Sequence, residues 1–362
     1  MSPDKSQRTA GIQARKAAHL DLCEHEAVES QDKTTLFEDV DFVHTALPEL
    51  ALDDLDCAAA FLGKRLRAPF LITGMTGGTD DAFAVNRDLA AVAERCGLGF
   101  GLGSQRVMQR DPCTAYTFAV RDVAPTALVL SNIGIAQAGS LSSSALRSLV
   151  IDVGADALCV HLNPAQELIQ AEGDRNFRGG CATLERLCAE LPMPVVVKET
   201  GCGISRAVAD ALRRVGVRHV DVSGAGGTSW VRVESLRGNE RSRQLGEVFS
   251  NWGIPTAASL AMLRGAGLEV IASGGIRNGL EVAKAIALGA CVAGAALPVY
   301  RAYRSGGIDG AVQFVDQLID GLKAAMLLTG SRSLANLSRQ PLIFGERINA
   351  WLAADVSKEK GG

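Results

Sequence analysis

The sequence predicts a single (β/α)8 TIM barrel with an N-terminal segment and an insertion after the sixth strand. Short, continuously apolar runs recur from Pro69 onward, and each ends in glycine or polar residues. A stretch with apolar residues at helical spacing follows each run. Such alternation is typical of a parallel sheet covered by helices, and eight units in roughly 230 residues suit a closed barrel. An open doubly wound sheet remains the alternative.

The apolar pattern assigns each element in turn. The predicted strands are Phe70–Gly74, Leu98–Gly103, Ala127–Ser131, Ala157–His161, Val195–Glu199, His219–Ser223, Glu269–Ser273 and Cys291–Ala295. Predicted helices between them include Ala82–Cys96, Ser143–Val153, Arg206–Val215 and Asn278–Leu288. We expect residues 1–14 to form a mobile tail and residues 15–362 to form the barrel domain with its N-terminal segment. The polar stretch Thr228–Trp252 is rich in Arg and Glu and is expected to be the insertion or a lid.

The composition is that of an ordinary soluble protein. Of the 362 residues, 47% are hydrophobic and 21% charged, and the net charge is -3. This balance predicts no nucleic-acid partner and no membrane-surface binding.

Nine cysteines without a C-x-x-C pair indicate reduced thiols rather than disulfides or a zinc site. The N-terminus lacks the apolar core of a secretory signal, and the longest uncharged run, Ala285–Tyr300, is too short to cross a membrane. We therefore expect a cytoplasmic protein.

The last two strands end in a candidate phosphate-binding loop. Ser273-Gly-Gly-Ile-Arg277 follows the seventh strand and Gly294-Ala-Ala296 ends the eighth. Glycine lets backbone N–H groups approach an anion, and the helix that begins near Asn278 adds a favourable dipole. Barrels commonly hold phosphate at this position. The alternative is a tight turn that needs glycine only for its backbone conformation.

Lys198, at the end of the fifth strand, indicates a bound electron-accepting ring. A half-buried lysine needs an anionic or electron-rich partner, and beneath such a ring it would stabilise the negative charge of a reduced flavin. A Schiff-base lysine and a structural pair with Glu199 are the alternatives. The run Thr73-Gly-Met-Thr-Gly-Gly78 supplies glycines and hydroxyls that suit a flat ring, although glycine-rich loops are common.

Several polar residues can be explained either by ligand binding or by local structure. Ser104, Asn132 and Thr228 can each hydrogen-bond a ring heteroatom, but each also suits a turn or a helix cap. Arg15, Lys16 and Arg106 are candidates for binding a second anion, because arginine and lysine match phosphate oxygens. A solvated charged segment is the alternative for Arg15-Lys16, since the N-terminal segment would have to fold over the barrel mouth to bind anything.

The stretch His161-Leu-Asn-Pro-Ala-Gln-Glu167 directly follows the fourth strand. Glu167 suits Mg²⁺, which prefers carboxylate and phosphate oxygens, and His161 is expected to titrate near neutrality. A helix that starts at Pro164, with Glu167 near its dipole, accounts for part of the pattern. It leaves His161, Asn163 and Gln166 unexplained.

These motifs resemble one family, the FMN-dependent type 2 isopentenyl-diphosphate Δ-isomerases. The resemblance runs from Arg15-Lys16 to the C-terminal helices. Its motifs are Met75-Thr-Gly-Gly78, Gly103-Ser-Gln-Arg106, Ser131-Asn-Ile-Gly134, His161 to Glu167, Val197-Lys-Glu199, Gly224-Ala-Gly-Gly-Thr-Ser-Trp230 and Ser273 to Arg277. The chain departs from the family at Ala17-Ala18, where an acidic residue is expected.

The resemblance implies a role for each matching residue. It implies FMN contacts at Thr73, Gly74, Met75, Thr76, Ser104, Asn132, Lys198, Ser223, Thr228, Gly275, Ile276, Arg277, Ala295 and Ala296. It implies substrate contacts at Arg15, Lys16, Ser104, Gln105, Arg106, Asn163 and Gln166, catalytic roles for Gln166 and His161, and Mg²⁺ coordination by Glu167. It also implies a homo-oligomer, a tetramer or an octamer.

The implied reaction converts isopentenyl diphosphate to dimethylallyl diphosphate. A proton is added at C4 and another is removed at C2, with reduced FMN as the acid–base. NADPH would be needed only to reduce the flavin, since isomerisation is redox-neutral. The rival readings are an oxidoreductase on the same scaffold, with His161 as its base, and a flavin-binding protein without turnover.

Overall fold

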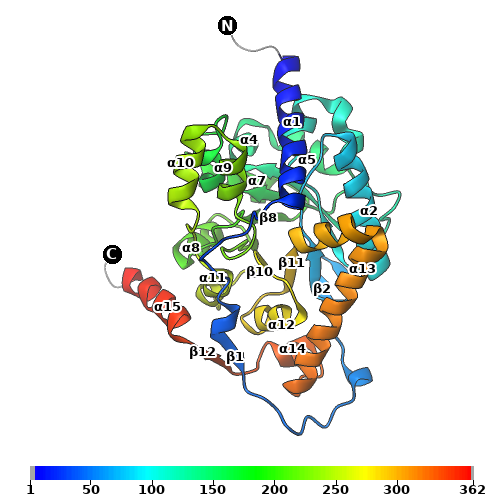
Figure 1. Ribbon diagram of the computed structural model, residues 1–362, viewed down its shortest axis with the longest axis vertical. Helices are drawn as coiled ribbons and strands as arrows, with labels where there is room; N and C mark the ends of the chain where they lie inside the picture. The colour runs from blue at the N-terminus through cyan, green and yellow to red at the C-terminus, as the bar shows by residue number, and fades with distance from the viewer. Residues whose placement is uncertain (1–4, 360–362) are drawn as a thin grey trace.

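The computed structural model describes residues 5–359, and its centre is a closed barrel of eight parallel strands (Figure 1). The strands are β4 (Phe70–Ile72), β5 (Gly99–Gly101), β6 (Leu128–Gly134), β7 (Ala157–His161), β8 (Val195–Lys198), β9 (His219–Asp221), β10 (Glu269–Ser273) and β11 (Val292–Ala295). They pair in chain order, and β11 closes the ring against β4. The predicted barrel is confirmed, and each predicted strand is present with small shifts at its ends.

Helices cover the outside of this barrel. Between the strands lie α2 (Asp80–Cys96), α3 (Arg106–Arg110), η3 (Pro112–Phe118), α4 (Ile135–Ser140), α5 (Ser143–Asp152), α6 (Pro164–Ile169), α7 (Gly180–Glu190), α8 (Arg206–Arg214), α11 (Thr256–Leu263) and α12 (Gly279–Ala287). After the last strand come α13 (Leu297–Leu328), α14 (Leu334–Leu337) and α15 (Glu346–Glu359). The ends of α2 show how the sequence sets such bounds: Ala82 N donates to Thr79 Oγ1 at 3.1 Å, and Gly97 ends the helix with a φ of 64°.

A short hairpin closes the N-terminal end of the barrel. Strands β2 (Ala59–Phe61) and β3 (Lys64–Leu66) pair with each other, and Phe61 packs with inward-facing residues such as Leu128 and Val196. A further pair joins β1 (Val40–Phe42) to β12 (Leu342–Phe344), beside the 3-10 turn η1 (Phe37–Asp39), and a second turn, η2 (Leu52–Asp54), precedes β2. The sequence did not predict these four strands, which are only three residues long each, and β2 lies in residues 42–62, where no clear period is present. With this end filled by apolar side chains, the other end is left for a site.

The N-terminal helix α1 (Lys5–His25) lies over the C-terminal ends of the strands (Figure 1). The chain beyond it runs along the loop after β9, where Ser30 N donates to Gly227 O and Ser229 N donates to Val28 O, both at 2.9 Å. Residues 5–14, assigned to a mobile tail in the sequence, belong to this helix. Residues 1–4 of that predicted tail lie outside the described residues.

The predicted insertion after the sixth strand is a pair of helices, α9 (Trp230–Arg237) and α10 (Glu240–Phe249). Helix α9 packs against both α1 and α6, so the insertion forms one wall of the barrel mouth.

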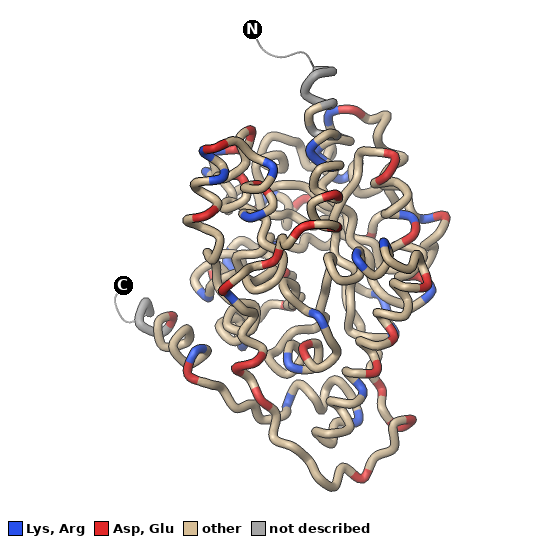
Figure 2. The backbone as a smooth tube through the Cα atoms, viewed as in Figure 1, with Lys and Arg blue, Asp and Glu red and all other residues tan. Residues whose placement is uncertain are grey.

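Basic and acidic residues are interspersed over the described part of the molecule (Figure 2). Between residues 5 and 359, no helix has the length and apolar character needed to cross a bilayer.

Candidate active site

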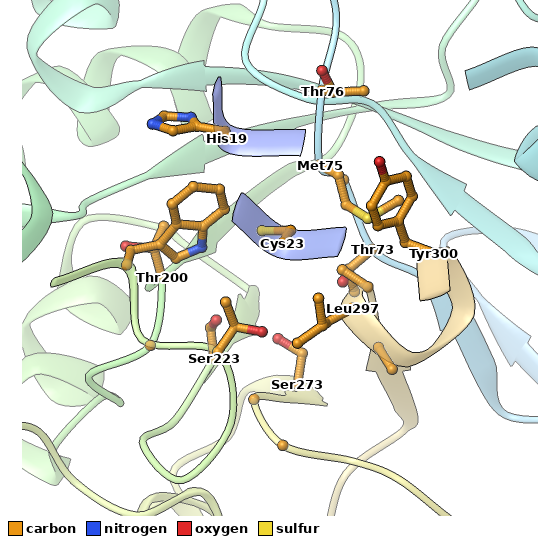
Figure 3. A pocket seen from close by; sticks show the side chains of 18 of the residues that line it. His19, Cys23, Thr73, Met75, Thr76, Thr200, Ser223, Ser273, Leu297 and Tyr300 are labelled. Atoms are coloured by element: carbon orange, nitrogen blue, oxygen red, sulfur yellow. The ribbon is translucent and has the colours of Figure 1, made fainter. Parts of the chain in front are cut away.

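Two adjoining cavities open at the C-terminal ends of the strands. We call the first the glycine-lined cavity. It has about 850 Å³ of empty space, counting the part open to solvent, and it is lined by Lys16, His19, Leu20, Cys23, Thr73, Gly74, Met75, Thr76, Lys198, Thr200, Gly201, Ser223, Thr228, Trp230, Ser273, Gly274, Gly275, Arg277, Ala295, Ala296, Leu297 and Tyr300. Figure 3 shows His19 and Cys23 of α1 above this cavity, and Ser223 and Ser273 opposite them.

We call the second the basic cavity. It has about 740 Å³ of empty space, again counting the part open to solvent. It is lined by Arg15, Lys16, His19, Gly74, Met75, Gly103, Ser104, Arg106, Asn132, Gln137, His161, Asn163, Gln166, Glu167, Gln170, Lys198, Thr200 and Trp230. Residues from α1, the loop after β4 and the end of β8 line both cavities. The two cavities therefore form one continuous site.

The floor of the glycine-lined cavity is built from loops in backbone contact. A Cβ placed on Gly227 would lie 2.3 Å from Gly275 N, so the loops after β9 and β10 approach too closely for a side chain at this point. Gly275 itself has a φ of 81°, which favours glycine. On the edge of this floor, Arg277 Nε donates to Glu29 Oε1 at 3.0 Å. The structure thus provides a small-residue cradle where the sequence predicted a phosphate-binding loop.

Lys198 lies over a pair of buried acids. Its Nζ donates to the backbone carbonyl of Glu199 at 2.9 Å, whereas the Glu199 carboxylate accepts from the N–H groups of Thr200 and Cys202 at 2.6 Å each. On the neighbouring strand, Asp221 Oδ1 accepts from Ser273 Oγ at 2.6 Å. Burial raises the pKa of both carboxyls, and the positive charge of Lys198 opposes that rise. The hydrogen bond to Glu199 O and the charges of the two acids therefore hold the Lys198 side chain, which lines both cavities.

Four cationic side chains, those of Arg15, Lys16, Arg106 and Lys198, line the basic cavity. Lys16 is buried, and its Nζ donates to Ser104 O at 2.8 Å and lies 5.3 Å from the centre of the Phe118 ring. Two effects lower the pKa of Lys16 to about 7: burial, which is the larger, and the positive charge of Arg15. The N-terminal segment does fold over the barrel mouth, as a role for Arg15 and Lys16 in binding an anion requires.

Acidic residues of the α6 region contact the two arginines loosely. Arg15 Nη1 lies 3.7 Å from Glu172, and Arg106 Nη1 lies 3.5 Å from Asp174 and 4.0 Å from Glu167. None of these separations is that of a strong hydrogen bond. The guanidinium groups therefore keep capacity for another anion.

Glu167 and Gln166 lie on the first turn of α6, which begins at Pro164 as predicted. Glu167 is buried, and its Oε2 accepts from Asp174 N at 2.6 Å. Gln166 Nε2 donates to Glu234 Oε1 at 3.1 Å. Both side chains line the basic cavity.

His161 does not titrate near neutrality, and that expectation is corrected. Burial, and after it the charges of Lys198, Arg106, Lys16 and Arg15, lower its pKa to about 3. Its Nδ1 lies 2.8 Å from Asn132 Oδ1, so the neutral ring donates from Nδ1 to that amide oxygen. His161 is a neutral hydrogen-bonding group of the basic cavity.

Two predicted contact residues lie in neither cavity. Gln105 is fully buried: its Nε2 donates to Leu149 O at 3.0 Å, and its Oε1 accepts from Ser131 and from Asn132 N. Its side chain holds α3 against β6 and has no group left for a substrate. Ile276 is likewise buried in the core, so its side chain is not available to a cofactor.

The remaining predicted residues line the site, in two groups. Thr73, Gly74, Met75, Thr76, Lys198, Ser223, Thr228, Gly275, Arg277, Ala295 and Ala296 line the glycine-lined cavity. Ser104 and Asn132, also predicted to contact the cofactor, line the basic cavity with Arg15, Lys16, Arg106, His161, Asn163, Gln166 and Glu167.

Sequence reasoning missed several residues of the site. His19 and Cys23 follow Lys16 at helical spacing, so a helix over this segment would have predicted them. Trp230 was part of a motif, but no role was assigned to it, and its ring lies edge-on to His19 with centroids 5.1 Å apart. Glu234 belongs to none of the motifs, so no sequence pattern predicted its role.

Glu234 joins three helices at the wall of the basic cavity. Its side chain is fully buried and accepts from His19 Nε2 at 3.0 Å, Gln166 Nε2 at 3.1 Å and Arg237 Nη2 at 2.8 Å. Burial opposes its ionisation, but these donors outweigh burial and lower its pKa to about 2. A buried carboxylate thus holds α1, α6 and α9 together.

Known proteins resemble this chain in fold and in sequence. A family model described as FMN-dependent dehydrogenase matches residues 145–343. Solved structures of mandelate oxidase share its fold: one superposes with a TM-score of 0.60 at 19% identity, covering 92% of this chain and all of the other.

Curated relatives are much more similar. The isopentenyl-diphosphate delta-isomerase of Methanosarcina mazei is 46% identical over 334 residues, 91% of each chain. That of a Synechococcus species is 49% identical over 321 residues, 88% of this chain and 91% of the relative. That of a Nostoc species is 43% identical over 342 residues, 93% and 97% of the two chains. With the FMN-type barrel and both cavities in place, the chain belongs to the type 2, FMN-dependent family of isopentenyl-diphosphate delta-isomerases.

Proposed function

We propose that this chain converts isopentenyl diphosphate to dimethylallyl diphosphate, with FMN in the glycine-lined cavity and the diphosphate in the basic cavity. The observation that carries the proposal is the continuity of the two cavities. Gly74, Met75, Lys198 and Trp230 line both, so a ring in one lies against a substrate in the other.

The residues of the glycine-lined cavity fit FMN. Thr76 Oγ1 is buried without a hydrogen-bond partner among the described residues, which suits a bound ligand. The cradle around Gly275, together with Arg277, would hold the phosphate. The loop that starts at Thr73 would support the ring, and Lys198 would stabilise negative charge on the reduced ring.

The basic cavity supplies charge for the diphosphate and a ligand for Mg²⁺. Arg15, Lys16 and Arg106 would bind the phosphate oxygens. Glu167 is our proposed protein ligand of the metal. Within residues 5–359 there is no cluster of three His, Cys, Asp or Glu side chains that would form a metal site alone. Mg²⁺ bound by one carboxylate, the diphosphate and water is the usual arrangement for this ion.

Reduced FMN, when bound, supplies the acid–base group that adds a proton at C4 and removes one at C2. The chain's own residues orient the alkene and exclude water. Gln166 faces the substrate and is held in place by Glu234. His161 is neutral, so we assign it a hydrogen-bonding role rather than that of a general acid. NADPH would serve only to reduce the flavin.

Isotope incorporation tests this function. The reduced holoenzyme with Mg²⁺ and isopentenyl diphosphate in D₂O is expected to give deuterated dimethylallyl diphosphate without stoichiometric use of NADPH. Consumption of NADPH in step with product would indicate the rival oxidoreductase instead. FMN binding without any exchange would indicate a flavoprotein that does not turn over this substrate.

A further inference from the structure

The basic cavity holds an unusual share of the unpaired buried polar atoms. Over the described part of the chain, six buried side-chain nitrogen or oxygen atoms have no hydrogen-bond partner: Arg15 Nε, Thr76 Oγ1, Arg106 Nε, Gln170 Nε2, His219 Nδ1 and Asn251 Oδ1. Three of them, all nitrogens, belong to residues that line the basic cavity. Buried polar groups are normally paired, so their concentration here indicates acceptors that come from outside the chain.

Gln170 is the one of these three residues that no motif singled out. It is 3% exposed and follows α6 directly. Its backbone is fixed, because Gln170 N donates to Gln166 O at 2.9 Å and its carbonyl accepts from Arg175 Nη2 at 2.8 Å. The side chain lines the basic cavity on this rigid backbone, and its Nε2 is left unpaired.

The surroundings limit what can accept from this amide. The cations Arg15, Lys16 and Arg106 line the same cavity, so an anion is favoured there. The Glu167 carboxylate accepts from Asp174 N and from Asn163 Nδ2, at 2.6 and 3.3 Å, and its remaining capacity is the one we assign to the metal. Phosphoryl oxygens accept hydrogen bonds and carry the charge that these cations require.

We propose that Gln170 is a further substrate-binding residue, whose Nε2 donates to an oxygen of the substrate's diphosphate group. The inference rests on the proposed function, because it assumes that the basic cavity takes a diphosphate ester. Gln170 touches the part of the substrate that does not react. It contributes equally to the ground state and the transition state, and so acts on KM rather than on kcat.

Gln170→Met separates this role from a structural one. Methionine has similar length and removes the donor. A glutamine that does not contact the diphosphate would give a variant with unchanged affinity for it. Under either hypothesis the loss of an unpaired buried donor is expected to leave thermal stability at or above that of wild type. A donor to the diphosphate gives a variant of wild-type stability whose affinity falls about 10-fold or more.

The experiment titrates the FMN-loaded protein with inorganic pyrophosphate and Mg²⁺ by calorimetry. Wild type, Gln170→Met, Gln170→Glu and the control Gln244→Met are compared. Gln244 lies on α10, outside both cavities, and its side chain donates to Glu240 at 2.9 Å, so its variant is expected to match wild type. Gln170→Glu, which keeps the shape and replaces the donor with an anion, is expected to bind more weakly than Gln170→Met. Flavin absorbance and thermal melting confirm folding of each variant.

The results separate the two proposals. A Gln170→Met variant that binds pyrophosphate as tightly as wild type, while wild type isomerises isopentenyl diphosphate, overturns the role of Gln170 and leaves the proposed function standing. Wild-type protein that neither isomerises the substrate nor binds pyrophosphate overturns both. A raised KM for isopentenyl diphosphate with kcat within about threefold of wild type supports the assignment.

Discussion

A lysine buried without a carboxylate beside it is the clearest sign at residue scale that the basic cavity takes an anion. Lys16 donates to the backbone carbonyl of Ser104, and the one charge among the described residues that shifts its pKa is the like charge of Arg15. Its pKa of about 7 lies far below the ordinary 10.5. The ammonium form is therefore disfavoured in the free protein, and an anion that enters the cavity restores it.

This shift predicts a pH dependence of diphosphate binding. Above pH 7 the free protein has lost the Lys16 proton, and the bound anion favours its return, so binding takes up a proton. Affinity for pyrophosphate is expected to fall as pH rises above 7, by up to about tenfold per pH unit. Calorimetry in buffers of different ionisation enthalpy measures that uptake.

Lys16→Met is the matched variant. It is expected to bind pyrophosphate more weakly and to lose the part of the pH dependence that exceeds the titration of pyrophosphate itself. Identical pH profiles for the two proteins would refute the assignment. The folded state also carries a penalty for the buried charge, which is full below pH 7 and disappears as pH rises towards 10.5, so Lys16→Met is expected to stabilise the fold most at low pH.

At the scale of elements, α9 matters because Glu234 joins it to α1 and to α6. Each of these helices presents a donor to this one carboxylate. The wall of the basic cavity therefore depends on a single buried charge.

Glu234→Gln is expected to lower the free energy of unfolding by about 3 kcal/mol, because the Arg237 guanidinium loses its buried anionic partner. Amide hydrogen exchange should accelerate in α1 and α9 before the barrel strands. Glu240→Gln, on the exposed side of α10, is the control and should change stability by less than about 0.5 kcal/mol. Equal exchange rates in α1 for Glu234→Gln and wild type would contradict the linking role.

At the scale of the whole molecule, the barrel separates stability from function along its axis. Phe61 and its hairpin fill the N-terminal end, and the cavities occupy the other. A change at the filled end should therefore cost stability without disturbing the site.

Phe61→Ala tests that separation. Phe61 is 1% exposed, so its truncation is expected to cost about 3–5 kcal/mol in denaturant unfolding. The affinity of the folded protein for FMN, measured by quenching of flavin fluorescence, should remain within about twofold of wild type. Leu47→Ala, at a side chain that is 78% exposed, is the stability control. A large loss of FMN affinity in Phe61→Ala would show that the two ends are coupled.

The amino-acid sequence alone is sufficient to predict the barrel and most of the residues that line the site. Eight apolar runs separated by amphipathic stretches leave few other folds, and strand ends meet on one face, so polar residues after the strands predicted a common site. Motif residues such as Lys198 and Glu167 line that site as expected. Local pattern is sufficient for these conclusions, because burial follows from periodicity and parallel strand direction follows from the alternation of strands with helices.

Tertiary contacts determine which side chains within those motifs remain available to a ligand. Gln105 and Gln170 are both glutamines beside the site. The side-chain amide of Gln105 bonds to Leu149 and Ser131, whereas Nε2 of Gln170 has no hydrogen-bond partner among the described residues. His161 is neutral chiefly because it is buried, and the positive charges of side chains from α1, α3 and β8 lower its pKa further. The linking role of Glu234 depends on the packing of α1 against α9, which brings His19 to its carboxylate. Hydrogen-bond partners and electrostatic environment arise from residues far apart in the chain, so no local pattern contains them.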